Sequence, residues 1–126
     1  MKELLAVAIG GGIGSAGRFL LSGIVLHHFP NMRFPLPTLV VNVLGCFAIG
    51  LLAGYIDRSH PGAGLLRLFL ITGCLGGFTT FSAFGFETFF LLETGSLWLG
   101  VANVAISIVA GLGGVVAGFR LLGPAV

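Results

Sequence analysis

Long apolar runs and short polar segments alternate along the whole chain. Four apolar runs can be drawn, at about 4–26, 36–56, 65–92 and 97–122. Each is close to or above the roughly 20 residues that an α-helix needs to cross the hydrocarbon core of a bilayer. The segments between them are short and contain prolines, including Pro61, or a Thr-Gly pair, which are typical of turns. The pattern therefore predicts four transmembrane helices.

The composition strengthens this interpretation. Of 126 residues, 56% are hydrophobic and 8% are charged, and the mean hydropathy is +1.12. Soluble globular domains do not have this composition. We therefore predict an all-α integral membrane protein in which residues 1–126 form a single four-helix transmembrane domain. The net charge of +2 is too small to indicate nucleic-acid binding.

The basic residues favour one orientation in the membrane. With four spans, the N-terminus, the second connection and the C-terminus share one side, which carries Lys2, Arg58, Arg67 and Arg120. The opposite side carries Arg33. Because Lys and Arg are enriched in cytoplasmic segments, this distribution predicts a cytoplasmic N-terminus.

The third apolar run is interrupted at Gly76–Phe84, whose sequence is GGFTTFSAF. This stretch places two adjacent glycines before hydroxyl-bearing and aromatic side chains, and it contains no charge. In a bilayer core every backbone N–H and C=O group needs a partner, so a helix break is tolerated only where it is buried in protein or lines a site for ions or water. The sequence therefore predicts a third helix broken near Gly76–Thr80, and the break is a candidate ion site.

Polar side chains occur inside the second and fourth runs at matched spacings. Thr38 and Asn42 are one helical turn apart, and so are Asn103 and Ser107, so each pair projects from one helix face. Together they predict a polar track through the bundle. The alternative is that the hydroxyls bond back to their own helix and that the asparagines bridge helices, and the sequence leaves both open.

Two charged residues lie within the runs. Arg18 is a candidate for attracting anions at a vestibule, or for anchoring its helix with a side chain that reaches the headgroups. Glu87 follows the break by about two turns and is a candidate proton carrier, cation ligand or partner of an arginine. Cys46 and Cys74 lack the spacing of a metal site, so they are expected to be core residues.

The chain contains 22 glycines, and several are spaced at i and i+4, which places them on one helix face. Such pairs let membrane helices approach closely. They predict tight helix packing in general and no particular interface. The pairs are Gly10 and Gly14, Gly50 and Gly54, and Gly114 and Gly118.

Taken together, three groups of residues resemble the Fluc, or CrcB, family of fluoride channels over essentially the full length of the chain. They are Gly10–Gly14 with Arg18 and Phe19, Pro37–Gly45 with Phe47 and Gly50, and Gly76–Phe84 with Glu87. Each glycine motif is common by itself, whereas the combination is highly specific.

The resemblance implies an antiparallel dual-topology homodimer with two narrow fluoride pathways and a structural sodium ion at the dimer centre. By family similarity, the carbonyl oxygens of Gly76 and Thr79 from each subunit would bind the sodium ion. Oxygen atoms are the ligands that hard cations prefer. The implied partners are fluoride, a second copy of the chain and the lipid bilayer.

The resemblance also implies an anion pathway. Hydroxyl and amide donors would replace the water around fluoride, and phenylalanine ring edges, which carry partial positive charge, would face the anion. The implied pathway residues are Thr38, Asn42, Phe81, Ser82, Phe84, Asn103 and Ser107, with Arg18 and Glu87 as vestibule or support residues. Two positions depart from the family pattern, because Asn103 stands where many relatives carry tyrosine and Ala83 stands where threonine is frequent.

These inferences favour a passive, fluoride-selective channel, rather than an enzyme, in the cell inner membrane or plasma membrane of a prokaryote. A negative-inside potential would drive the anion out of the cytoplasm through such a channel. Two other classes stay open. A small proton-coupled multidrug exporter would use Glu87, the deep carboxylate of the chain. A noncatalytic assembly subunit would need only the glycines and the polar bridges.

Overall fold

The computed structural model describes residues 1–59 and 64–123, so the predicted turn at Pro61 lies outside the described residues. The elements are α1 (Lys2–His28), α2 (Leu36–Ser59), α3 (Gly64–Arg67), the π-helix η1 (Leu68–Leu75), α4 (Gly76–Phe78), α5 (Phe81–Glu93) and α6 (Leu97–Leu122). Within the described ranges, four helical segments are long and apolar enough to cross a membrane, and the third runs from α3 to α5. The four predicted spans are confirmed.

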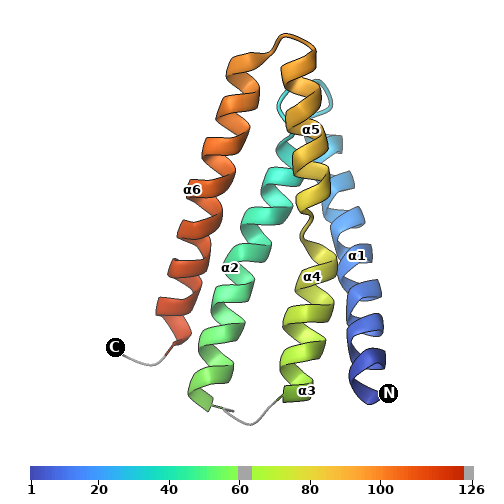
Figure 1. Cartoon of the computed structure of the whole chain (residues 1–126), viewed down its shortest axis with the longest axis vertical. Helices are drawn as coiled ribbons and strands as arrows, with labels where there is room; N and C mark the ends of the chain where they lie inside the picture. The colour runs from blue at the N-terminus through green and yellow to red at the C-terminus, as the bar shows by residue number, and fades with distance from the viewer. Residues whose placement is uncertain (60–63, 124–126) are drawn as a thin grey trace.

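The spans lie side by side with their long axes roughly aligned (Figure 1). α2 packs most extensively on α6, whereas α1 packs on η1 and α4. The start of α1 and the end of α6 lie at one end of the bundle, and the α5–α6 turn lies at the other (Figure 1). This arrangement is the one expected for an even number of spans. The orientation in the membrane stays a prediction.

Glycines on α1 bring its backbone against the backbone of the third span. A Cβ atom added at Gly10 would lie 2.5 Å from the carbonyl oxygen of Phe69, and one at Gly14 would overlap the carbonyl oxygen of Cys74. At Gly77 an added Cβ would overlap the carbonyl oxygen of Gly11. Since all of these neighbours are backbone atoms, the two helices meet without side chains between them.

A second set of glycines joins α2 to α6. An added Cβ at Gly50 would overlap the carbonyl oxygen of Val115, and one at Gly118 would overlap the carbonyl oxygen of Phe47. The predicted tight packing through spaced glycines is therefore confirmed within one chain. The sequence had not indicated which helices these glycines would join.

The third span breaks inside the predicted interval, at two threonines. Thr79 has φ −81° and ψ 157°, and Thr80 has φ −147° and ψ 113°, so both are extended. Gly76 and Gly77 are helical and belong to α4. Gly77 thus lets α4 approach α1 closely, whereas the helix is interrupted at Thr79 and Thr80.

The π-helix at Leu68–Leu75 was not predicted from the sequence. This segment contains Gly73, whose Cα lies against the backbone of α1. π-Helical turns are rare, occur mostly inside α-helices and are frequent at functional sites. Here the π-helix immediately precedes α4 and the break.

The turn between α5 and α6 follows its predicted chemistry. Gly95 has φ +77°, a conformation that glycine adopts without steric cost. The N–H of Gly95 donates to the carbonyl of Leu92 at 3.1 Å, and the N–H of Ser96 donates to the carbonyl of Leu91 at 2.8 Å. The last carbonyls of α5 are therefore satisfied before the chain reverses.

Large apolar side chains are exposed along the spans. Phe81 is 82% exposed and Trp98 is 83% exposed. A helix that is apolar around its whole circumference is suited to lipid or to the interior of an assembly. The outer surface of the bundle is therefore apolar, as a membrane protein requires.

Candidate functional site

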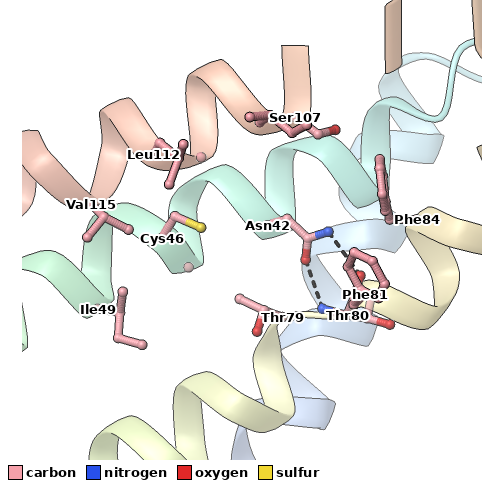
Figure 2. Close-up of a pocket in the computed structure, with 13 residues that line it drawn as sticks. Asn42, Cys46, Ile49, Thr79, Thr80, Phe81, Phe84, Ser107, Leu112 and Val115 are labelled. Carbon is pink, nitrogen blue, oxygen red and sulfur yellow. Dashed lines mark hydrogen bonds between the residues drawn. The ribbon is translucent and has the colours of Figure 1, made fainter. Parts of the chain in front are cut away.

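The break in the third span is held by Asn42 of α2. The N–H of Thr80 donates to Oδ1 of Asn42 at 2.8 Å, and Nδ2 of Asn42 donates to the carbonyl oxygen of Thr80 at 3.0 Å (Figure 2). One side-chain amide thus satisfies both backbone polar groups of an extended residue. In a bilayer such groups cannot rely on water, so this pairing stabilises the break.

Thr80 also begins α5. Its hydroxyl oxygen accepts the N–H of Ala83 at 3.2 Å, which makes it the N-cap of the helix, and it lies 3.2 Å from the hydroxyl of Ser82. Thr80 was not among the site residues predicted from the sequence. The available signal was a threonine directly before a helical segment, a position where threonine is preferred.

These hydrogen bonds release two carbonyl groups from helical pairing. In a continuous helix the N–H of Thr80 would donate to the carbonyl of Gly76, and the N–H of Ala83 would donate to that of Thr79. Both donors instead bond side-chain oxygens, of Asn42 and of Thr80 respectively. The carbonyl groups released are those predicted to bind sodium.

The neighbouring carbonyl is occupied. Ser15 of α1 donates its hydroxyl to the carbonyl oxygen of Gly77 at 3.3 Å. Within the described ranges, no group of three or more His, Cys, Asp or Glu side chains is placed to hold a metal ion. Carbonyl oxygens suit sodium, so the residues at the break fit the predicted ion.

A cavity of about 430 Å³ lies beside the break, between α2, the third span and α6. Asn42, Thr80, Phe81, Phe84 and Ser107 line one end of it, and Cys46, Ile49, Leu112 and Val115 line the other (Figure 2). The polar groups are therefore concentrated at the end near the break. Four of the predicted pathway residues meet here, namely Asn42, Phe81, Phe84 and Ser107.

Phe81 and Phe84 form a pair at this end of the cavity. Their ring centroids are 5.5 Å apart and the ring planes are inclined by 43°. The rings are therefore neither stacked in parallel nor perpendicular, and their edges carry partial positive charge. Phe81 is mostly exposed, whereas Phe84 is partly buried.

Three predicted pathway residues do not line the cavity: Thr38, Ser82 and Asn103. Thr38 is 8% exposed and donates its hydroxyl to Oε1 of Glu87 at 2.7 Å. The other oxygen of that carboxylate, Oε2, is buried and has no hydrogen-bond partner in the described part of the chain. This pair links α2 to α5 about one turn beyond Asn42 and Phe84.

Asn103 of α6 is 2% exposed, and its Nδ2 donates to the hydroxyl of Thr88 at 2.9 Å. Thr88 in turn donates to the carbonyl oxygen of Phe84 at 2.7 Å. Thr88 was not among the site residues predicted from the sequence. Asn103 therefore bridges α5 and α6, which was the alternative to a place on a polar track. The amide of Asn42 also bridges two segments, α2 and the break in the third span.

Arg18 stands apart from these contacts. It is half-buried on α1, it does not line the cavity, and it has no hydrogen-bond or ion-pair partner among residues 1–59 and 64–123. The structure thus brings together the break, the phenylalanine pair and the donors of α2 and α6, and it leaves Arg18 separate.

Comparison with known proteins agrees with this geometry. Residues 5–119 match the family model described as CrcB-like protein, Camphor Resistance (CrcB). The chain is 48% identical over 122 residues to the fluoride-specific ion channel FluC of Methylobacillus flagellatus, covering 97% of this chain and 95% of that protein. It is 44% identical over 126 residues to the protein of the same name from Rhodospirillum centenum, covering 100% and 99%.

A third relative, the fluoride-specific ion channel FluC of Ruminiclostridium cellulolyticum, is 45% identical over 124 residues, which is 96% of this chain and 95% of that protein. The four apolar spans and the bacterial relatives indicate a multi-pass membrane protein of a prokaryote. The chain belongs to the CrcB family of fluoride ion channels.

Proposed function

We propose that this protein is a passive, fluoride-selective channel whose anion pathway begins in the cavity beside the break. The observation that carries the proposal is the meeting of Asn42, Ser107 and the Phe81–Phe84 pair in one cavity, whose lining among the described residues contains no charged side chain. A small anion needs donors in place of water, and uncharged donors let it leave again.

Two donors are available to an anion in the cavity. The amide nitrogen of Asn42 carries two hydrogens, of which one is donated to Thr80. The hydroxyl of Ser107 has no hydrogen-bond partner among the described residues. The electropositive edges of Phe81 and Phe84 complete the surroundings, because ring edges attract anions while ring faces repel them.

The pathway would continue one turn beyond the cavity, past Thr38, Glu87 and Asn103. Thr38 precedes Asn42 by one turn of α2, and Asn103 precedes Ser107 by one turn of α6, so both lie toward the α5–α6 end of the bundle. Ser82, beside Thr80, adds a hydroxyl near the break. Arg18 has no partner among the described residues and would act on anions from a distance, at a vestibule.

The active assembly would be an antiparallel, dual-topology homodimer with two pathways. The exposure of the large apolar Phe81 side chain at the rim of this largely apolar cavity supports a second copy covering this face. The carbonyl groups of Gly76 and Thr79, released from helical pairing, would bind a structural sodium ion at the centre. When bound, sodium would supply positive charge that stabilises clustered carbonyl oxygens.

Such a channel would protect the cytoplasm. Hydrogen fluoride crosses membranes as a neutral acid and ionises inside, and the negative-inside potential would then drive fluoride out without an energy source. The exporter alternative, which needed Glu87 as a proton carrier, is not favoured, since the relatives found are named fluoride channels.

Fluoride efflux from liposomes that contain only this protein tests the proposal. A potassium ionophore sets the potential, chloride is the competing anion, and protein-free liposomes are the control. We expect rapid fluoride efflux with negligible chloride efflux and no response to a proton gradient. Absence of fluoride efflux from liposomes that contain folded protein and sodium would reject it. Sodium binding is tested separately, by a thermal unfolding midpoint that rises with Na⁺ and not with K⁺.

A further inference from the structure

We propose that Asn103 and Thr88 are positioning residues. Through two consecutive hydrogen bonds they hold the carbonyl group of Phe84, and they thereby fix the rotation of α5 about its own axis. The proposal rests on the proposed function, because its consequence is the placement of the Phe84 ring on the anion pathway. It gives Asn103 a role in which its amide need not contact the ion.

The geometry leaves little freedom at Thr88. Its hydroxyl has one hydrogen, which is donated to the carbonyl of Phe84 at 2.7 Å. The hydroxyl oxygen can then only accept from Asn103, and Nδ2 of Asn103 lies 2.9 Å away. The orientation of the Asn103 amide is therefore set by the bond to Thr88. At 2% exposure, the Asn103 side chain is shielded from the solvent that could otherwise replace this partner.

α5 needs such a constraint because its packing is sparse. The two extended residues Thr79 and Thr80 separate it from α4, so the upstream helix does not dictate its rotation. It makes few contacts with α2 and α6, and a Cβ added at Gly85 would meet open space. Hydrogen bonds from neighbouring helices therefore determine how α5 is turned.

Two hydrogen bonds reach consecutive residues of α5 from different helices. Thr38 of α2 bonds Glu87, and Asn103 of α6 bonds Thr88. Consecutive residues project about 100° apart around a helix, so these two bonds together resist rotation in both directions. Thr88 lies one turn after Phe84 on the same face. Loss of the bond from α6 would free one of the two constraints and displace the ring of Phe84.

The position of Asn103 makes the inference specific to this chain. Asn103 stands where the resemblance leads us to expect tyrosine, and an asparagine amide brings a donor to the hydroxyl of Thr88 at close range. From the sequence alone, asparagine in place of tyrosine at position 103 would be interpreted as the loss of a hydroxyl from the pathway. The structure assigns the asparagine to a contact between α5 and α6.

Substitutions at both partners test the proposal in fluoride-loaded liposomes. T88V removes the hydroxyl and keeps the branched shape, T88S keeps the hydroxyl, and N103L removes the amide at similar size. We expect T88V and N103L each to lower fluoride efflux about tenfold, since a buried donor or acceptor loses its partner. T88S should keep nearly full efflux. The T88V/N103L double variant should be no worse than either single variant, because both break one chain of bonds.

Thr94 supplies a matched control. Its hydroxyl also donates to the carbonyl four residues earlier, that of Phe90, at 2.8 Å, and lies 3.3 Å from the carbonyl of Leu91, and within the described residues it bonds no asparagine. T94V should therefore conduct like the wild-type protein. Normal efflux in T88V, or additive losses in the double variant, would overturn the proposal and return Asn103 to direct contact with the ion.

Hydrogen exchange measured by mass spectrometry makes the outcome independent of conduction. T88V and N103L should speed exchange in α5 and leave α1 and η1 unchanged, even if the wild-type protein does not conduct fluoride. Unchanged exchange in α5 would reject the positioning role. Absence of wild-type efflux together with faster exchange in the variants would reject the proposed function and keep the positioning role.

Discussion

The two halves of the third span are held in the bundle by different means. Before the break, η1 and α4 meet α1 backbone to backbone, and a Cβ at Gly14 would overlap the carbonyl oxygen of Cys74. After the break, α5 is joined to α2 and α6 by hydrogen bonds to Thr80, Glu87 and Thr88. Close packing of backbone on backbone holds the first half in place, and hydrogen bonds from polar side chains hold the second.

Under the proposed function, this difference separates the residues that hold the fold together from those that affect ion flux. Backbones in direct contact leave no room for an ion, whereas hydrogen bonds hold α5 while a cavity of about 430 Å³ stays open beside it. We therefore expect substitutions that disturb the first half to change folding. Substitutions in the second half should change ion flux at smaller cost to stability.

Gly14→Ala should have the largest effect. The added Cβ would meet the backbone of Cys74 and would lie 2.8 Å from the nitrogen of Phe78, so α1 would have to separate from the third span. We expect a loss of about 3 kcal/mol, at the upper end for overpacking, and little folded protein after size-exclusion chromatography in detergent.

Gly12→Ala is the matched control on the same helix, because an added Cβ there has nothing within 4 Å. It should be neutral or slightly stabilising, since alanine favours helix more than glycine does. Equal thermal unfolding midpoints for Gly14→Ala and Gly12→Ala would contradict the conclusion that close backbone packing against α1 holds the first half of the third span.

Asn42→Leu should come next, and it affects both halves because it removes the two bonds that hold Thr80. The N–H and the carbonyl of Thr80 would be left without these partners, at a cost of about 2 kcal/mol, and fluoride efflux should be abolished. Asn42→Asp keeps the acceptor but adds a negative charge beside the cavity. It should lower efflux strongly with a smaller shift in the unfolding midpoint. Normal efflux in either variant would argue against a pathway through this cavity.

Phe81→Ile and Phe84→Ile should reduce fluoride efflux about tenfold and leave the folded assembly intact. Apolar volume is largely kept, while the electropositive ring edge and the contact between the two rings, which is worth roughly 1 kcal/mol, are lost. Efflux in liposomes and elution volume in detergent measure the two effects. Unchanged efflux in both variants would count heavily against a pathway lined by aromatic rings.

Arg18→Ala should have the smallest effect, because Arg18 has no partner to lose in the described part of the chain. We expect efflux to fall by at most about threefold at low salt and to match the wild type near 1 M salt, where the screening length is about 3 Å. A loss that persists at high salt would show that Arg18 supports α1 instead of attracting anions.

The predictions made from the sequence succeeded where the cause is local. Run length and apolar composition set the four spans, and Gly95 set the turn after α5. The interval of the break was also predicted, because glycines and hydroxyl residues in a long apolar run are visible in sequence. The pairing of Asn42 with Thr80 was not, since 38 positions separate these residues and no local pattern links them.

For the polar residues too, the sequence predicted their position along each helix, and contacts between helices determined their partners. The sequence placed Thr38 and Asn103 on polar helix faces but left open whether they would face a pathway or bridge helices. Their partners, Glu87 and Thr88, lie 49 and 15 positions away. Which side chains meet depends on how the helices are turned against one another, and the π-helix η1 and the two extended threonines change that rotation along the third span.

The sequence by itself determined a four-span membrane protein with an interrupted third span, because hydrophobic length and backbone satisfaction in lipid act on contiguous residues. Only the tertiary structure decided which carbonyl groups lose their helical partners and which phenylalanines and donors share a cavity. It also decided that the Asn103 amide bonds Thr88. These features depend on contacts between helices, which a glycine or a hydroxyl permits without specifying its partner.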